Sequence, residues 1–194
     1  MIKQFNDYDK TQGYATFETL PRGGYVLKIM GAQVCDGNSG QYIKIGCDVA
    51  EGEYAGFFEK AYRNDQRETK KWGCNYLLNI PKDDGTEQDK WTKRRFKTFT
   101  EALEDSNDGY HFDWDEQKFK GKLIGGLFNV REYEKQDGST GSATNLAQVT
   151  SVKNIRDGKY KIPADKLLHK AQAVTGNDGF MSIPDGVKEE LPFD

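Results

Sequence analysis

In the stretch QYIKIGCDVA, residues 41–50, apolar side chains occupy every second position. An alternation with a period of two is the pattern of a β-strand that buries one face. The set that we expect to face a core is Ile43, Ile45, Cys47 and Val49. The other set contains Tyr42 and Lys44, which are therefore expected to point outward.

Further strands are expected on both sides of this one. Residues 25–35 alternate in a similar way, and the intervening loop, residues 36–40 (DGNSG), has the composition of a hairpin turn. A third strand is expected over Phe57–Arg63, and either of its faces could be the buried one because both carry apolar residues. Three strands joined by short connections are typical of the start of a small barrel.

The second half of the chain adds a hairpin and two helices. Residues 122–134 and 142–155 are expected to pair around the turn-rich loop 135–141. After Thr92 the period becomes helical, with apolar residues at Phe96, Phe99, Ala102 and Leu103. A second, short helix is expected to end near Lys170. The fold class predicted from this order is mainly β, a five-stranded OB-like Greek-key barrel with an inserted helix and a short C-terminal helix.

Composition divides the chain into three parts. We expect an irregular N-terminal arm over residues 1–20, an OB-like domain over 21–172, and a flexible acidic C-terminal tail over 173–194. The chain has a formal net charge of −3, of which residues 176–194 contribute −4, so the remainder is close to neutral. A nearly neutral body can still carry a local basic stripe.

Several classes of protein are disfavoured. No apolar run approaches the length of a membrane span, the first ten residues lack the apolar stretch of a secretory signal, and the three cysteines form no Cys-x-x-Cys pair. A cytoplasmic setting is therefore expected, with neither a structural zinc site nor a disulfide framework. His111 and His169 stand apart from any catalytic motif, and Asp113–Glu116 is more typical of a solvated turn than of a cation site. We expect no enzyme activity, no metal and no cofactor.

Basic residues interleaved with aromatic ones are the strongest functional signal, and they are densest at residues 70–72 and 90–97. Cations neutralise phosphates, and flat rings stack on unpaired bases. The residues expected to stack on bases are Tyr42, Phe58, Tyr62, Trp72 and Trp91. The residues expected to contact phosphates are Lys44, Lys60, Arg63, Lys71, Arg94 and Arg95. The alternative for residues 90–97 is an ordinary solvated helix face.

The C-terminal sequence VKEELPFD, residues 187–194, is acidic and closes on apolar residues, a composition suited to a peptide that binds a partner. The predicted partner-binding residues are Glu189, Glu190, Leu191, Pro192 and Phe193. The alternative is a terminus that serves only solubility.

Four stretches of the chain carry a resemblance to a known family: LPRGGYV (20–26), EGEYAGFF (51–58), FKGKLIG (119–125) and NIRDGKYKIP (154–163). Together they resemble uncharacterised phage and prophage proteins of Gram-positive hosts, often encoded beside replication and recombination genes. The resemblance covers about residues 20–170 and implies an OB-like single-stranded DNA-binding protein. The tail is also similar to the acidic tip with which bacterial single-stranded DNA-binding proteins recruit replication and repair partners, although here Asp194 follows Phe193.

The leading hypothesis is a single-stranded DNA-binding protein that supports phage DNA replication or recombination and binds largely without sequence preference. Its tail would bind replication or recombination proteins, no membrane is involved, and a homo-oligomer remains an open alternative. The rival hypothesis is a non-enzymatic protein-interaction or assembly adaptor on an OB-like fold. A metal-dependent nuclease is disfavoured because the carboxylates are not grouped at a suitable spacing.

Overall fold

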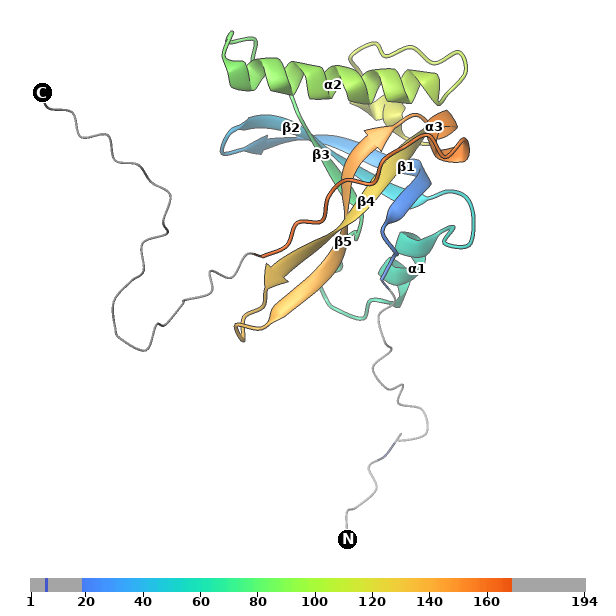
Figure 1. Cartoon of the computed structure of the whole chain (residues 1–194), viewed down its shortest axis with the longest axis vertical. Coiled ribbons are helices and arrows are strands. Elements are labelled where there is room, and N and C mark those ends of the chain that lie inside the picture. The colour runs from blue at the N-terminus through green and yellow to red at the C-terminus, as the bar shows by residue number, and fades with distance from the viewer. Residues whose placement is uncertain (1–5, 7–18, 169–194) are drawn as a thin grey trace, which may run out of the picture.

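Five strands pair in one antiparallel sheet in the computed structural model, which describes residue 6 and residues 19–168 (Figure 1). The strands are β1 (Gly23–Gly37), β2 (Gly40–Val49), β3 (Asn75–Asn79), β4 (Leu123–Glu134) and β5 (Thr140–Thr150). Their order across the sheet is β3-β2-β1-β4-β5. The predicted mainly β class, the β1–β2 hairpin and the β4–β5 hairpin are thereby confirmed.

The sheet is open, so the OB-like barrel expected from the sequence is not confirmed. β3 and β5 form its two edges, and no strand pairing joins them within the described residues, although the two strands approach each other. The sheet is nevertheless irregular in two places. A bulge at Met30 interrupts the register of β1 with β2, and a second shift lies between Leu127 and Phe128 in β4. Bulges bend and twist the strand that carries them, so the sheet can curl around its inner face without closing.

The predicted third strand over Phe57–Arg63 is wrong, because these residues form helix α1 (Phe57–Asn64). The cause lies ten residues earlier. The buried carboxylate of Asp48 in β2 accepts hydrogen bonds from the backbone N–H groups of Phe58, at 2.9 Å, and Glu59, at 3.1 Å. The N-cap residue Gly56 has no side chain to satisfy these groups, so a neighbouring strand caps the helix instead.

Replacing Asp48 with alanine is expected to lower the free energy of unfolding by about 1–3 kcal/mol, because a buried and a partly buried N–H group at the start of α1 would lose their acceptor. Asp48→Asn keeps one acceptor oxygen and should lose roughly half as much. Urea unfolding followed by far-UV circular dichroism measures both. Equal stability of Asp48→Ala and the wild-type protein would contradict the capping role.

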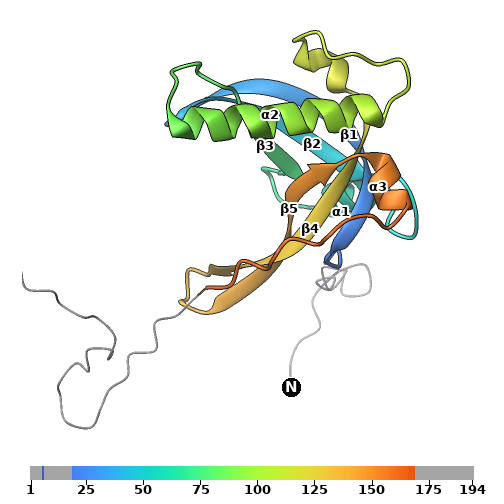
Figure 2. The same cartoon turned by 45° about the horizontal axis from the view of Figure 1, so that its top comes forward.

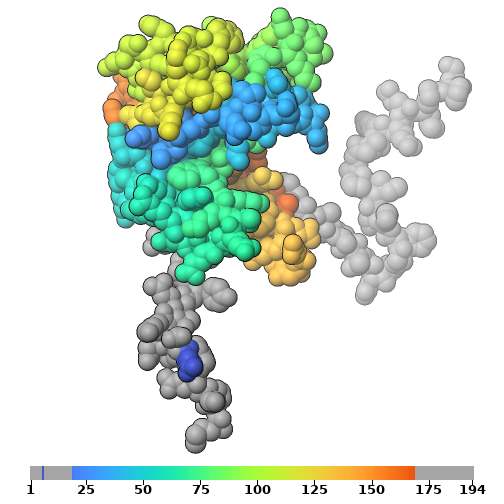
Figure 3. Space-filling view, turned by 180° about the vertical axis from the view of Figure 1, so that it is seen from behind, coloured from blue at the N-terminus to red at the C-terminus, as the bar shows by residue number. Residues whose placement is uncertain are grey.

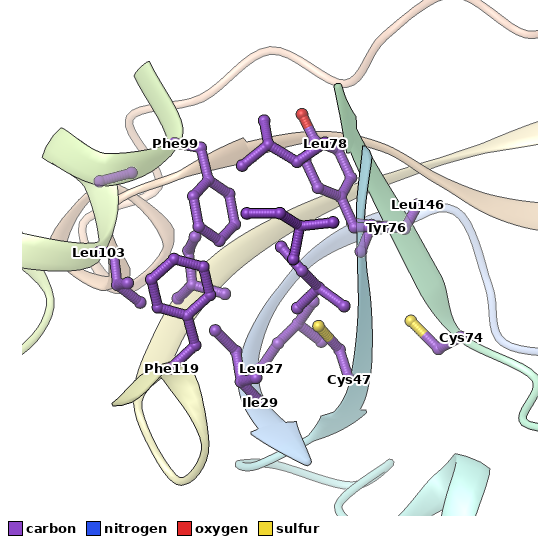
Figure 4. Packing of buried hydrophobic residues seen from close by; sticks show 14 of the residues in the cluster. Leu27, Ile29, Cys47, Cys74, Tyr76, Leu78, Phe99, Leu103, Phe119 and Leu146 are labelled. Carbon is purple, nitrogen blue, oxygen red and sulfur yellow. The ribbon is translucent and has the colours of Figure 1, made fainter. Parts of the chain in front are cut away.

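Helix α2 (Glu87–Asp105) is the helix predicted between the third and fourth strands, and it lies across one end of the sheet (Figures 1 and 2). It begins five residues before Thr92, because the side chain of Thr86 accepts a hydrogen bond from the backbone N–H of Asp89 at 3.1 Å and so caps the helix. Phe99 and Leu103 reach from α2 into the core, where Phe119 of the short helix η2 (Glu116–Phe119) packs at 5.5 Å from Phe99 between ring centroids (Figure 4).

The segment after β5 differs from the prediction in two ways. The strand ends at Thr150, and the short helix α3 (Val152–Arg156) follows, capped by Ser151. No helix occupies residues 161–168, which instead run beside β4. There Lys166 donates its N–H to the carbonyl of Val130 at 2.8 Å, and its own carbonyl accepts from Glu132 at 2.9 Å. β4 pairs with β1 only as far as Phe128, so the backbone groups of its later residues on that side have no strand partner. They bind residues 161–168 instead, which favours an extended conformation there.

Three sequence predictions lie outside the described residues. They are the conformation of the N-terminal arm, apart from residues 6, 19 and 20, the end of the C-terminal helix at residues 169–170, and the acidic tail at 173–194. None of the helices that the structure describes is long and apolar enough to cross a membrane.

Candidate nucleic-acid interface

The outer face of β2 begins the candidate site. Ile43 and Ile45 point into the core, so the alternate residues Tyr42 and Lys44 lie on the opposite face, Lys44 exposed and Tyr42 half-buried. In the register with β3, Lys44 stands opposite Leu77. The side chain of Leu77 is 49% exposed, which makes it an apolar residue on an otherwise polar outer face. The outward direction predicted for this side of β2 is confirmed.

Trp72 lies next to this row and is held in place by two features. Its indole N–H donates a hydrogen bond to the carbonyl of Cys47 at 2.8 Å. Its ring lies over Gly46, where a Cβ atom would be in ordinary van der Waals contact with it at 3.6 Å. Tyr62 of α1 packs beside it, with 5.6 Å between the ring centroids and 46° between the ring planes. The two predicted stacking residues are therefore neighbours in space.

Two cations adjoin this pair. The ammonium of Lys70 lies 5.7 Å from the centroid of the Tyr62 ring, and Lys71, next to Trp72 in the chain, is exposed. Neither lysine forms an ion pair with any residue that the structure describes. We call Tyr62, Lys70, Lys71 and Trp72 the aromatic patch. Figure 3 shows the side of the molecule on which α1, the loop after it and the β1–β2 hairpin come to the front.

Other basic residues near the patch have carboxylate partners or point elsewhere. Arg63 pairs with Glu59 at 2.5 Å. Arg67 donates hydrogen bonds to both oxygens of Asp65 and thereby lowers the pKa of that carboxyl to about 2, so this pair stays ionised and mutually neutralised at physiological pH. The positive charge that remains available beside the rings therefore belongs to the two lysines of the patch.

Two predicted contacts are weakened or removed by the structure. Phe58 was expected to stack on a base, but it is only 9% exposed and stacks in the core on Phe128, with 6.2 Å between centroids. This prediction is wrong because residues 57–64 are helical, which turns Phe58 inward at the start of α1. Lys60 on the same helix donates to the carbonyl of Ala55 at 3.1 Å, within the turn that precedes α1.

Arg95 connects α2 to the edge of the sheet. Its guanidinium lies 4.9 Å from the centroid of the Tyr76 ring, its Nε donates to the Tyr76 hydroxyl at 3.0 Å, and its Nη2 donates to the carbonyl of Leu77 at 3.1 Å. One turn earlier Trp91 is 65% exposed, and the guanidinium of Arg94 lies 5.4 Å from the centroid of its ring. These residues share one face of the helix, as their spacing of three and four predicts.

The remaining cations of α2 differ from these two arginines, because each has a carboxylate partner. Lys90 pairs with Glu87, Lys97 with Glu101, and Lys93 with Asp83 and Asp89. Such pairs cancel locally and attract a phosphate only weakly. The lysines among residues 90–97 thus behave as an ordinary solvated helix face, which was the alternative interpretation of this stretch. Arg94 and Arg95 differ, because neither has a carboxylate partner among the described residues.

We call two adjoining groups of residues the binding band: the aromatic patch, Lys44 and Leu77 on the outer face of the sheet, and Arg95, Arg94 and Trp91 on α2, which packs on the inner face. The two groups meet at the edge of β3, where Arg95 donates to the carbonyl of Leu77. Sequence reasoning assigned no contact to Lys70 or Leu77. The signal for Lys70 was its place in the Lys-Lys-Trp run, whereas Leu77 depended on recognising β3, for which no strand was predicted. The predicted tail residues 189–193 lie outside the described residues.

Other chemistries find little support among the described residues. They contain no group of three or more His, Cys, Asp or Glu side chains arranged to hold a metal ion. Cys47 and Cys74 are neighbours, since the N–H of Cys47 donates to the carbonyl of Cys74 at 3.0 Å. A hydrogen bond with the Cys47 thiol, together with burial, raises the pKa of Cys74 well above its ordinary value, so its thiol stays protonated and is a poor nucleophile. No protein-family model and no curated protein matches this chain.

Proposed function

We propose that this protein binds single-stranded DNA along the binding band, largely without sequence preference. The observation that carries the proposal is the contact between Tyr62 and Trp72, at 5.6 Å, beside two lysines without carboxylate partners. The Tyr62 side chain is 38% exposed and the Trp72 side chain is partly buried, and both lie next to unpaired cations. Such rings and cations match the two features that a single strand offers, which are unstacked bases and phosphates. Duplex DNA offers the phosphates but hides the base faces.

The resemblance of four sequence stretches to phage proteins supports the same proposal and adds a context, DNA replication or recombination, with the tail as the part that recruits partner proteins. The strand order supports an OB-like architecture. An OB-fold is a partly open Greek-key barrel that binds oligonucleotides on its second and third strands. Here the helix between β3 and β4, the opening between β3 and β5, and the position of the band on β2 and β3 all agree with that arrangement.

A second function rests on a different surface. Trp114 is 80% exposed and stacks on Phe96, with 6.0 Å between centroids, in a loop where Asp113 and Asp115 flank it. Lys118 pairs with Asp113 and lies 3.9 Å from Asp115, so these carboxylates are largely neutralised. What the loop offers a partner is mainly the exposed indole, a group that is enriched in protein–protein interfaces. This loop favours a protein-interaction role, which would accompany or replace DNA binding.

The test of the proposed function is a fluorescence-anisotropy titration of a labelled oligo-dT of about thirty nucleotides, with a duplex of equal length as competitor. Phosphate contacts from Lys44, Lys70, Lys71, Arg94 and Arg95 would reduce affinity about a hundredfold between about 50 and 200 mM salt. Equal affinity for the duplex would contradict stacking. Absence of binding at low salt would overturn the proposal and leave the protein-interaction role.

A further inference from the structure

A cleft lies where the row of Tyr42 and Lys44 ends. Its volume is about 710 Å³, within the range of about 300–1,000 Å³ that is usual for sites that hold a small molecule. The turn between β1 and β2 forms one side, and the loop that leads into α2 forms the other; both lie together at the upper left of Figure 1. Tyr42 and its cross-strand neighbour Asn79 belong both to the cleft and to the outer face of the sheet. The cleft is therefore continuous with the binding band.

Glycines in the turn shape this cleft. A Cβ atom on Gly37 would come within 3.1 Å of the Tyr42 ring, so the ring lies over a position without a side chain. Gly40 has a φ of +123°, and a Cβ there would come within 2.6 Å of the side chain of Lys82. Lys82 thus lies across the turn with its ammonium at the cleft, and it forms no ion pair with a described residue. An aromatic wall and a free ammonium are suited to the base and the phosphate of one nucleotide.

The polar groups of the cleft differ from those of the band because acceptors predominate over charged donors. Asp84 accepts from the backbone N–H of Thr86, at 3.0 Å, and from its hydroxyl, at 2.7 Å, both with Oδ1. These hydrogen bonds lower the pKa of Asp84, so the group is ionised at neutral pH. Its Oδ2 accepts no hydrogen bond from the described residues. The side-chain amides of Asn79 and Gln88 add groups that can both donate and accept.

We infer that this cleft receives one unpaired base of the bound strand and favours cytosine over thymine. The inference rests on the proposed function, and it adds a preference for one base to binding that is otherwise largely independent of sequence. Cytosine presents an exocyclic amine, which can donate to the free oxygen of Asp84, beside ring acceptors that can take hydrogen bonds from an amide. Thymine presents a carbonyl oxygen where cytosine has the amine. A carboxylate facing that carbonyl is repelled, and neither group can donate.

The experiment compares oligo-dC with oligo-dT of equal length by anisotropy, at a slightly alkaline pH at which cytosine is unprotonated. Both are pyrimidine strands with similar stacking, so a difference between them reports the groups on the base. The wild-type protein is expected to bind oligo-dC roughly tenfold more tightly. The test variant is Asp84→Asn, which keeps an oxygen for Thr86 but replaces the free acceptor with an amide donor. It should abolish or reverse the preference.

The control variant is Asp83→Asn. It removes a carboxylate charge from the neighbouring residue, whose side chain does not line the cleft. Asp83→Asn also releases Lys93 from an ion pair, so the two variants need not match in overall affinity. The readout is therefore the ratio of oligo-dC to oligo-dT affinity, which Asp83→Asn should leave unchanged. Equal binding of the two strands by the wild-type protein, or the same preference in both variants, would overturn the inference while leaving the proposed function intact. Absence of binding to either strand would overturn both.

Discussion

Replacing Tyr62 and Trp72 together with alanine is expected to weaken oligo-dT binding at least about tenfold, and also to lower stability because Trp72 packs against the core. Stacking of one base on one ring contributes about 1–3 kcal/mol, and these two rings lie side by side at one end of the binding band. The two losses are not expected to add fully, because rings 5.6 Å apart share their partners. Anisotropy at constant salt measures the change, since salt alters the phosphate contacts rather than the stacking.

Two controls separate stacking from damage to the structure. Trp114→Ala removes an exposed indole of the same kind in the acidic loop and should leave the affinity for DNA unchanged. Trp72→Phe keeps a ring over Gly46 but removes the indole N–H that binds the Cys47 carbonyl. It should retain most of the affinity. A double variant that binds oligo-dT as tightly as the wild-type protein would contradict the role assigned to the aromatic patch.

Phe58→Ala is expected to lower the free energy of unfolding by about 3–5 kcal/mol, because it removes a buried ring from the core and leaves a cavity against Phe128. Tyr62→Ala on the same helix is the matched control. Its side chain is 38% exposed, so the change should cost much less. Urea unfolding gives both values.

The same pair of variants should behave in the opposite way in DNA binding. The folded fraction of Phe58→Ala should keep its affinity for oligo-dT, whereas Tyr62→Ala should lose part of it. A Phe58→Ala protein as stable as the wild type but deficient in DNA binding would restore the prediction made from the sequence, in which Phe58 faces solvent.

The sequence predicted well where a local pattern was long and one-sided. β2 was recognised from its alternation, and its direction relative to the core followed, so Tyr42 and Lys44 were placed on the outer face. The β1–β2 turn and the position of α2 between strands were recognised for the same reason, since turn chemistry and helical spacing depend on residues close together in the chain.

The sequence failed where a short segment is ambiguous by itself. Residues 57–64 carry apolar residues on two faces, and their helical state depends on Asp48, which caps them from another element. β3 is only five residues long, and its pairing with β2 identifies it more clearly than its composition does.

By itself, then, the sequence determined the mainly β class and the two hairpins, and it pointed to the residue types that we propose stack on bases and neutralise phosphates, because each depends on neighbours along the chain. Only the tertiary structure decided which of those residues stand together. It brought Trp72 over Gly46 and beside Tyr62, placed Arg95 on the edge of β3, and buried Phe58. The physical reason is that a side chain's exposure and its charge partners are set by contacts between segments distant in sequence, and no local pattern records those contacts.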